Sequence, residues 1–131
     1  MITDWSTVKW FKAFEFDSPD TPGSGSLMDA DFVRKLDLLR EACKCSLIIN
    51  SGYRTSLHNA TVKDSVDGSA HTTGHAVDIQ ALGSVRKFTI LEAALRLGFR
   101  RIGVGATFLH LDDDITKPQD VVWTYASTRT T

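Results

Sequence analysis

The sequence has few of the features that would assign it to a specialised class of protein. No apolar run approaches the about 20 residues needed to span a bilayer, so no membrane insertion is expected. The 15 basic side chains are balanced by 16 acidic ones, and the formal net charge of -1 gives no basic footprint for nucleic acid. The first residues lack the basic start and apolar stretch of a secretory signal. We therefore expect a protein made in the cytoplasm without a signal peptide and with no nucleic-acid partner.

Cysteine is also scarce, because the 131 residues contain only Cys43 and Cys45. A pair separated by one residue is poorly placed for the Cα spacing and Cβ geometry of a disulfide without local distortion. The Cys-Lys-Cys segment could contribute to a metal site, but two thiols alone do not complete one. The favoured interpretation is one buried and one exposed thiol in a reducing compartment.

Length and hydrophobic patterning predict a single α+β domain over residues 1–131. Apolar residues at helical spacing predict a helix over 31–44, with Asp29 as its N-cap. A second helix is expected to start at an N-cap near Ser84, to stop at Gly98, and to carry Phe88, Leu91 and Leu95 on one apolar face.

Short strands are expected at 46–50, 75–79, 101–105, 108–111 and 121–124. The order of helix, strand, long loop, strand, helix and then strands predicts a small, mainly antiparallel sheet with flanking helices.

Two segments contain the residues that point to chemistry. In residues 69–78, His71 and His75 have helical i, i+4 spacing, but Thr72, Thr73 and Gly74 are poor helix formers. A turn at Gly74 that brings His71 in a loop close to Asp78 in a strand is the better geometry. Asp78 lies between apolar neighbours, where an unpaired carboxylate would be costly to bury, so it needs a partner such as a divalent metal.

The second segment is Phe108-Leu109-His110-Leu111-Asp112. Residues two apart in a strand share a face, so His110 and Asp112 point the same way while the leucines point to the core. Either segment alone is better explained by histidines with ordinary hydrogen-bond partners. Together they supply two imidazoles and a carboxylate, which is the ligand set of a catalytic zinc site with a position left open for water.

Four segments carry a family resemblance: Ser51-Gly52-Tyr53-Arg54, Ser-Ala-His-x-x-Gly-x-Ala-x-Asp at 69–78, Ile102-Gly103-Val104-Gly105 and 108–112. In order and spacing the chain resembles the zinc D-alanyl-D-alanine carboxypeptidases (peptidase family M15, carboxypeptidase-like branch), over about residues 10–125. This family also contains phage L-alanyl-D-glutamate endopeptidases and relatives of the hedgehog signalling domain. The resemblance implies a hedgehog-like fold and one zinc ion per chain held by His71, Asp78 and His110.

The same resemblance implies that Arg54 holds a substrate carboxylate and that Ser69 belongs to the substrate pocket. From the residues alone, Arg54 could equally be a surface arginine after a turn. The phage endopeptidases place an acidic general base three residues before the last histidine ligand, where this chain has Thr107. Asp112 is then the nearest candidate, either as the base or as a group that orients a ligand histidine by accepting its other ring N–H.

The resulting functional prediction is a zinc metallopeptidase that cleaves peptidoglycan stem peptides, of the D-Ala-D-Ala carboxypeptidase or L-Ala-D-Glu endopeptidase type. The protein is expected to be a monomer and a phage or prophage endolysin. It would act on the bacterial cell wall after release, or as a virion component. The alternative is a non-catalytic, zinc-stabilised binding or virion structural domain of the same fold.

Overall fold

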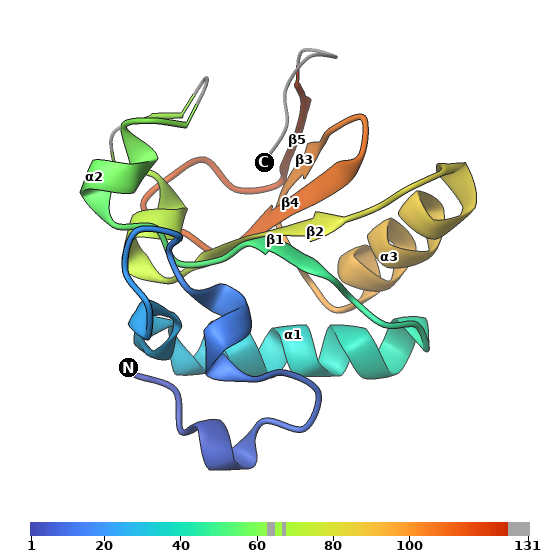
Figure 1. Cartoon of the computed structure of the whole chain (residues 1–131). Coiled ribbons are helices and arrows are strands. Elements are labelled where there is room, and N and C mark those ends of the chain that lie inside the picture. Colours follow the sequence, from blue (N-terminus) through green and yellow to red (C-terminus); the bar gives the residue numbers. More distant parts are fainter. Residues whose placement is uncertain (63–64, 67, 126–131) are drawn as a thin grey trace.

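The computed structural model describes residues 1–62, 65–66 and 68–125 of the chain. The fold is α+β, with three α-helices and a five-stranded mixed sheet (Figure 1). In chain order the elements are η1 Trp5–Thr7, η2 Ala13–Phe16, η3 Ser24–Leu27, α1 Ala30–Cys43, β1 Ile49–Ser51, α2 Ser56–Asn59, η4 Ala70–Thr73, β2 Ala76–Gln80, α3 Ser84–Arg96, β3 Arg101–Val104, β4 Phe108–Asp112 and β5 Val121–Thr124, where η marks a 3-10 turn.

The sheet has the strand order β1-β2-β4-β3-β5. All neighbouring pairs are antiparallel except β3 and β5, which run parallel at one edge. This arrangement confirms the predicted α+β class with a mainly antiparallel sheet. None of the helices in the described part of the chain has the length and apolar content needed to cross a bilayer.

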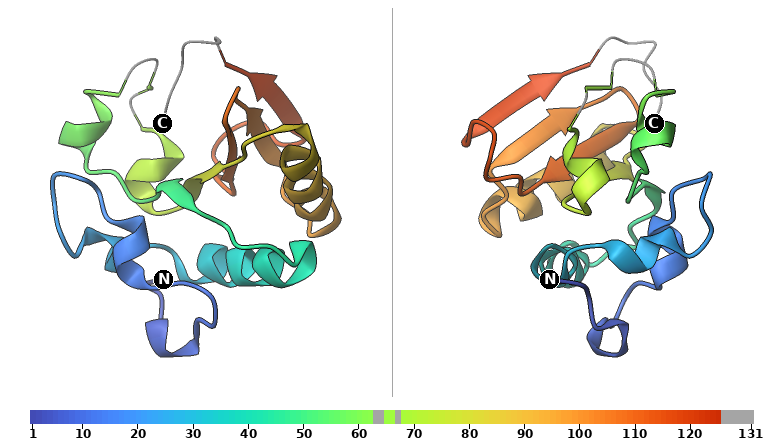
Figure 2. Two further views of the ribbon diagram at one scale, coloured as in Figure 1. Left: turned by 45° about the vertical axis from the view of Figure 1, so that its right-hand side comes forward. Right: turned by 90° about the vertical axis from the view of Figure 1, so that its left-hand side faces the viewer.

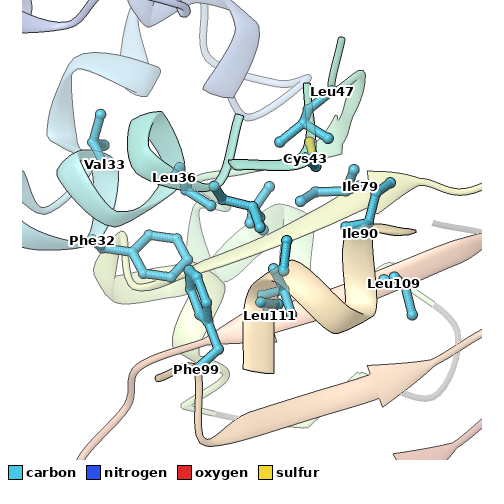
Figure 3. Packing of buried hydrophobic residues seen from close by; sticks show 14 of the residues in the cluster. Phe32, Val33, Leu36, Cys43, Leu47, Ile79, Ile90, Phe99, Leu109 and Leu111 are labelled. Atoms are coloured by element: carbon cyan, nitrogen blue, oxygen red, sulfur yellow. The ribbon is translucent and has the colours of Figure 1, made fainter. Parts of the chain in front are cut away.

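The hydrophobic core lies between the sheet and the helices α1 and α3. Buried side chains of α1 meet apolar residues of β2 and β4, and Phe32 packs edge-on against Phe99 at a centroid distance of 6.2 Å (Figure 3). Side chains alternate between the two faces of a strand, so Ile79 and Leu109 point into this core while their neighbours point to the opposite face. The helices therefore cover one face of the sheet and leave the other for the polar residues.

The first helix is close to its prediction. Asp29 is its N-cap and accepts a hydrogen bond from the Phe32 backbone N–H at 3.2 Å, as expected. The helix ends at Cys43, because Lys44 adopts a left-handed conformation with φ 55. Two turned views show the N-terminal residues running along the outside of α1 (Figure 2). Asp37 of α1 holds them there by accepting hydrogen bonds from the backbone N–H groups of Lys9 and Trp10.

The predicted apolar face of the second helix is wrong for two of its three residues, because only Leu91 packs against the core, where it is partly buried. Phe88 is 67% exposed and Leu95 is 57% exposed, whereas Ile90, Ala93 and Ala94 are buried. The buried face of α3 therefore runs through Ile90, Ala93 and Ala94, which have helical spacing as well. The N-cap is Gly83, so Ser84 is the first helical residue.

Two of the predicted strands are shifted in the structure. The segment expected as a strand from residue 46 enters the sheet only at Ile49, and the strand expected from residue 75 begins at Ala76. A bulge between Ile49 and Ser51 changes the register of β1 on β2. The segment between β1 and β2, which contains α2 and η4, lies at one end of the sheet (left in Figure 1).

Gly74 fixes the turn between η4 and β2. It adopts φ +77, and a Cβ atom at this position would lie 2.7 Å from the Leu27 carbonyl oxygen and 3.0 Å from the Met28 Cα. Both neighbours are backbone atoms, so the contact cannot be relieved by a side-chain rotation. The backbone conformation and the close approach together require glycine here.

We expect Gly74→Ala to lower the free energy of unfolding by about 3 kcal/mol, because left-handed strain and steric overlap act together. Gly23→Ala is the matched control, since Gly23 has φ +87 and no atom lies within 4 Å of the position that its Cβ would take. The control should lose only about 1 kcal/mol. Urea unfolding of both variants measures the difference, and equal losses would show that the overlap at Gly74 has no energetic effect.

Candidate metal centre

Strand alternation places two of the predicted ligands on the sheet face opposite the helices. Asp78 of β2 and His110 of β4 are direct partners in the antiparallel register. His71 reaches the same point from η4. All three side chains are buried, and each offers a ligand atom within 4.8 Å of the others. The structure thus confirms the predicted convergence of His71, Asp78 and His110 into a group that could hold a metal ion.

The imidazole of His71 is held in one orientation. Its Nδ1 lies 2.7 Å from the Gly52 carbonyl oxygen, so Nδ1 carries the proton and donates. Burial lowers the pKa of His71, which keeps the ring neutral and leaves a lone pair on Nε2. This Nε2 is buried without a hydrogen-bond partner in the described part of the chain, and it lies 3.5 Å from Asp78 Oδ2, which is long for a hydrogen bond. A metal ion is the partner that this lone pair fits.

The Gly52 carbonyl group, which accepts the hydrogen bond from His71, is held in place by tight packing of the surrounding backbone. A Cβ atom on Gly52 would lie 2.8 Å from the Cα of Phe16, and Tyr53 donates its backbone N–H to the Phe16 carbonyl at 2.9 Å. The N-terminal residues therefore support the carbonyl group that orients the first ligand.

Asp78 is completely buried, and its two oxygens have different partners. Oδ1 lies 2.9 Å from His110 Nδ1, and Oδ2 accepts from Arg54 Nη2 at 3.1 Å. Although burial acts to raise it, the pKa of Asp78 stays well below its usual range, because its electrostatic interactions with His71 and His110 and its hydrogen bond with His110 favour the ionised form. The carboxylate is therefore ionised, as a metal ligand must be.

His110 contacts carboxylates on both sides of its ring. Its Nε2 lies 2.6 Å from Asp112 Oδ2, opposite the Nδ1 contact with Asp78. Burial acts to lower the pKa of His110, but the hydrogen bonds to Asp112 and Asp78 raise it overall. A metal ion beside Asp78 would take the proton's place at Nδ1, while Nε2–H would keep its contact with Asp112.

Arg54 is buried, which rules out the interpretation as a surface arginine. Its side chain is 2% exposed, and besides Asp78 it donates to Ser51 Oγ at 3.0 Å and to Asn59 Oδ1 at 3.2 Å. Its backbone N–H also donates to the His71 carbonyl at 3.0 Å. Arg54 thus binds one predicted ligand through its side chain and a second through its backbone.

Ser69 is the N-cap of η4 and accepts a hydrogen bond from the His71 backbone N–H at 3.3 Å.

His75 is not part of the group: it is half-exposed, and its Nδ1 contacts Thr73 Oγ1 at 3.1 Å. The structure therefore favours the turn at Gly74, and not a helical pairing of His71 with His75.

A cavity of about 250 Å³ opens beside the group. Its lining contains every predicted site residue except Asp78, which is completely buried. The lining residues are Arg54, Ser65, Val66, Ser69, Ala70, His71, Arg101, His110, Asp112, Lys117, Trp123 and Tyr125.

The sequence reasoning missed Arg101, Asn59 and Trp123. Arg101 donates from Nε to Asp112 Oδ1 at 2.7 Å, and its guanidinium lies 5.0 Å from the centre of the Trp123 ring. Trp123 also packs against His110 at a centroid distance of 5.4 Å. The only signal for Arg101 is the opposite charge of Asp112, which is its direct partner across β3 and β4.

A comparison with known protein families matches residues 11–112 to Peptidase M15. The chain belongs to this peptidase family. No curated protein matches the sequence. The M15 match includes all three residues of the metal-binding group and ends at Asp112. Lys117, Trp123 and Tyr125, which line the cavity, lie beyond it.

We expect His71→Ala and His110→Ala to lose nearly all bound metal, because each removes a donor from a set of three. Metal content after equilibration with zinc and dialysis measures the loss. His75→Ala is the matched control and should bind as the unaltered protein does. Full metal content in either of the first two variants would contradict the assignment of the group.

Proposed function

We propose that the protein is a zinc-dependent peptidase that cleaves peptidoglycan stem peptides, of the D-Ala-D-Ala carboxypeptidase or L-Ala-D-Glu endopeptidase type. The observation that carries the proposal is the buried His71 Nε2, which has no hydrogen-bond partner among the described residues and lies beside an open cavity, within reach of Asp78 and His110. Membership of the M15 family supports the hydrolysis of a peptide bond. The endolysin role, with action at the bacterial cell wall after release or as a virion component, is part of the same proposal.

The donor set favours zinc among the common divalent metals. Two imidazoles and one carboxylate are the ligands of many catalytic zinc sites, whereas calcium and magnesium prefer oxygen ligands. When bound, zinc polarises an amide carbonyl and lowers the pKa of an attacking water. One ion per chain is expected, since His71, Asp78 and His110 are the one group of suitable geometry found among the described residues.

The cavity carries cationic groups that suit a substrate carboxylate. Arg54, Arg101 and Lys117 all line it, and the only acidic lining residue within the described part of the chain is Asp112. Lys117 donates to the Gly68 carbonyl and to Asp114 Oδ2, both at 2.8 Å, and so ties two loops together at the cavity rim. Stem peptides carry free carboxylates, which a guanidinium binds by charge-assisted hydrogen bonds.

The contacts of Asp112 favour the orienting role over that of a general base. Its Oδ2 meets His110 Nε2, while its Oδ1 accepts from Arg101 Nε and from the Asp114 backbone N–H. These hydrogen bonds contribute to a lowered pKa for Asp112, although burial acts to raise it. A carboxylate stabilised in its ionised form is a weaker proton acceptor, but it holds a ligand histidine well.

We expect Asp112→Asn to weaken zinc affinity by about 10-fold or more, as the loss of such supporting groups does, and to lower activity with it. Asp113→Asn is the matched control, because none of the contacts seen for its side chain involves the three ligands. Competition with a chromogenic chelator measures the affinity. Unchanged zinc affinity with nearly complete loss of turnover would instead identify Asp112 as the base.

A non-catalytic, zinc-stabilised domain is the second candidate. Thr107, which occupies the usual position of the acidic base, is exposed and does not line the cavity. Its carbonyl group accepts a hydrogen bond from the Ala81 backbone N–H at 2.9 Å, so its role in the structure is to join two strands. With Asp112 engaged on both oxygens, this arrangement favours binding without turnover.

Digestion of purified peptidoglycan by the zinc-loaded protein, followed by mass analysis of the fragments, tests the proposal. Loss of a terminal D-alanine supports the carboxypeptidase type, and release of peptides that begin with D-glutamate supports the endopeptidase type. Intact stem peptides, in the presence of one bound zinc per chain, would favour the non-catalytic candidate.

Arg54→Lys is expected to lower kcat/KM for such peptides by about 100-fold, because lysine keeps the charge but loses the planar fork of donors. Arg34→Lys is the matched control, since Arg34 is exposed on α1 and pairs only with Asp31 among the ion pairs found. Zinc content is measured alongside, because Arg54 also contacts Asp78. An Arg54→Lys variant with normal zinc content and unchanged kinetics would exclude Arg54 from substrate binding.

A further inference from the structure

The two cysteines of the chain lie in direct contact with each other. Neither belongs to the group that could hold a metal ion, and neither lines the cavity beside it. Cys45 Sγ donates to Cys43 Sγ at 3.3 Å, and no other cysteine exists to compete for either thiol. Cys43 ends α1 within the hydrophobic core (Figure 3), and Cys45 is half-buried against the same core instead of exposed as the sequence predicted. Lys44 between them adopts the left-handed conformation, and this turn brings both side chains to the same side.

We propose that Cys43 and Cys45 form a redox-active dithiol that closes reversibly to an intrachain disulfide by exchange with a small-molecule disulfide such as oxidised glutathione. The one-residue spacing in the sequence argued against this pairing. It contains no information on the backbone conformation of Lys44, which the structure supplies. With Lys44 in the left-handed region, the two sulfurs already touch in the reduced protein. Closure therefore starts from two sulfurs that are 3.3 Å apart.

The exchange proceeds in two balanced steps. The Cys45 thiolate attacks one sulfur of oxidised glutathione, forms a mixed disulfide and releases one glutathione thiolate. The Cys43 thiolate then attacks the Cys45 sulfur and releases the second glutathione. The protein dithiol loses two electrons and two protons, and the oxidised glutathione is reduced to two thiols.

The surroundings of the two thiols set the order of these steps. Cys43 is 8% exposed, and burial raises the pKa of its thiol, so it is poorly placed to meet an oxidant from solvent. Cys45 is the more accessible sulfur. The second step is intramolecular, and the contact already present between the sulfurs favours it over the attack of another molecule.

The test is equilibration of the full chain with mixtures of reduced and oxidised glutathione, followed by acid quenching, alkylation and intact-mass analysis. The unaltered protein should change from two alkylated thiols to none, with no glutathione retained and no dimer formed. Cys43→Ala should stop as a Cys45–glutathione mixed disulfide. Cys45→Ser should react about 10-fold more slowly than Cys43→Ala, because its remaining thiol is buried.

The same titration in urea separates a property of the fold from a property of the short sequence. The folded protein should form the intrachain disulfide at a ratio of oxidised to reduced glutathione at least about 10-fold lower than the unfolded chain requires. The proposal would be overturned if the unaltered folded protein ended as a mixed disulfide or formed dimers. It would also be overturned if the unaltered protein kept both thiols under conditions that modify Cys43→Ala. Equal ratios for the folded and unfolded chains would overturn it as well. None of these measurements depends on peptidase activity or on bound metal.

Discussion

The completely buried carboxylate of Asp78 is the constraint on which the site depends. An ionised group in the interior costs several kcal/mol unless charge and hydrogen bonds compensate it. Here the compensation comes from hydrogen bonds with Arg54 after β1 and His110 in β4, while His71 in η4 lies 3.5 Å from the same carboxylate. Each of these residues is itself held by the backbone or by a neighbour, so the carboxylate couples the loops at one end of the sheet to its central strands.

The alternation of side chains along β2 and β4 allows one pair of strands to serve two purposes. Val77, Ile79, Leu109 and Leu111 are buried in the apolar core beneath the sheet, while Asp78 and His110 between them lie on the opposite face, where His110 lines the cavity. A shift of register by one residue would exchange the two sets and place the polar groups in the core. The stability of the core and the position of the ligands are therefore fixed by the same strand pairing.

The sequence could predict those features that depend on neighbouring residues within one segment, but not those that depend on contacts between segments. Alternation around Asp78 and His110, the turn at Gly74 and the cap at Asp29 are local features, and the structure agrees with each. The exposure of Phe88 was not predictable from helical spacing, because the face through Ile90, Ala93 and Ala94 has helical spacing as well and only tertiary packing decides which face is buried. The contact between Arg101 and Asp112 requires knowledge of which strands are neighbours, and no spacing within one segment contains that information.

The edge position of β5 separates the shape of the cavity from the strand pairing that places the ligands. β5 pairs only with β3, in parallel, yet its Trp123 forms part of the cavity wall beside His110. The pairings of β2, β3 and β4, which place Asp78 and His110, do not involve it. Substitutions in this terminal strand can therefore reshape the wall of the cavity without altering the strand pairing that carries the ligands.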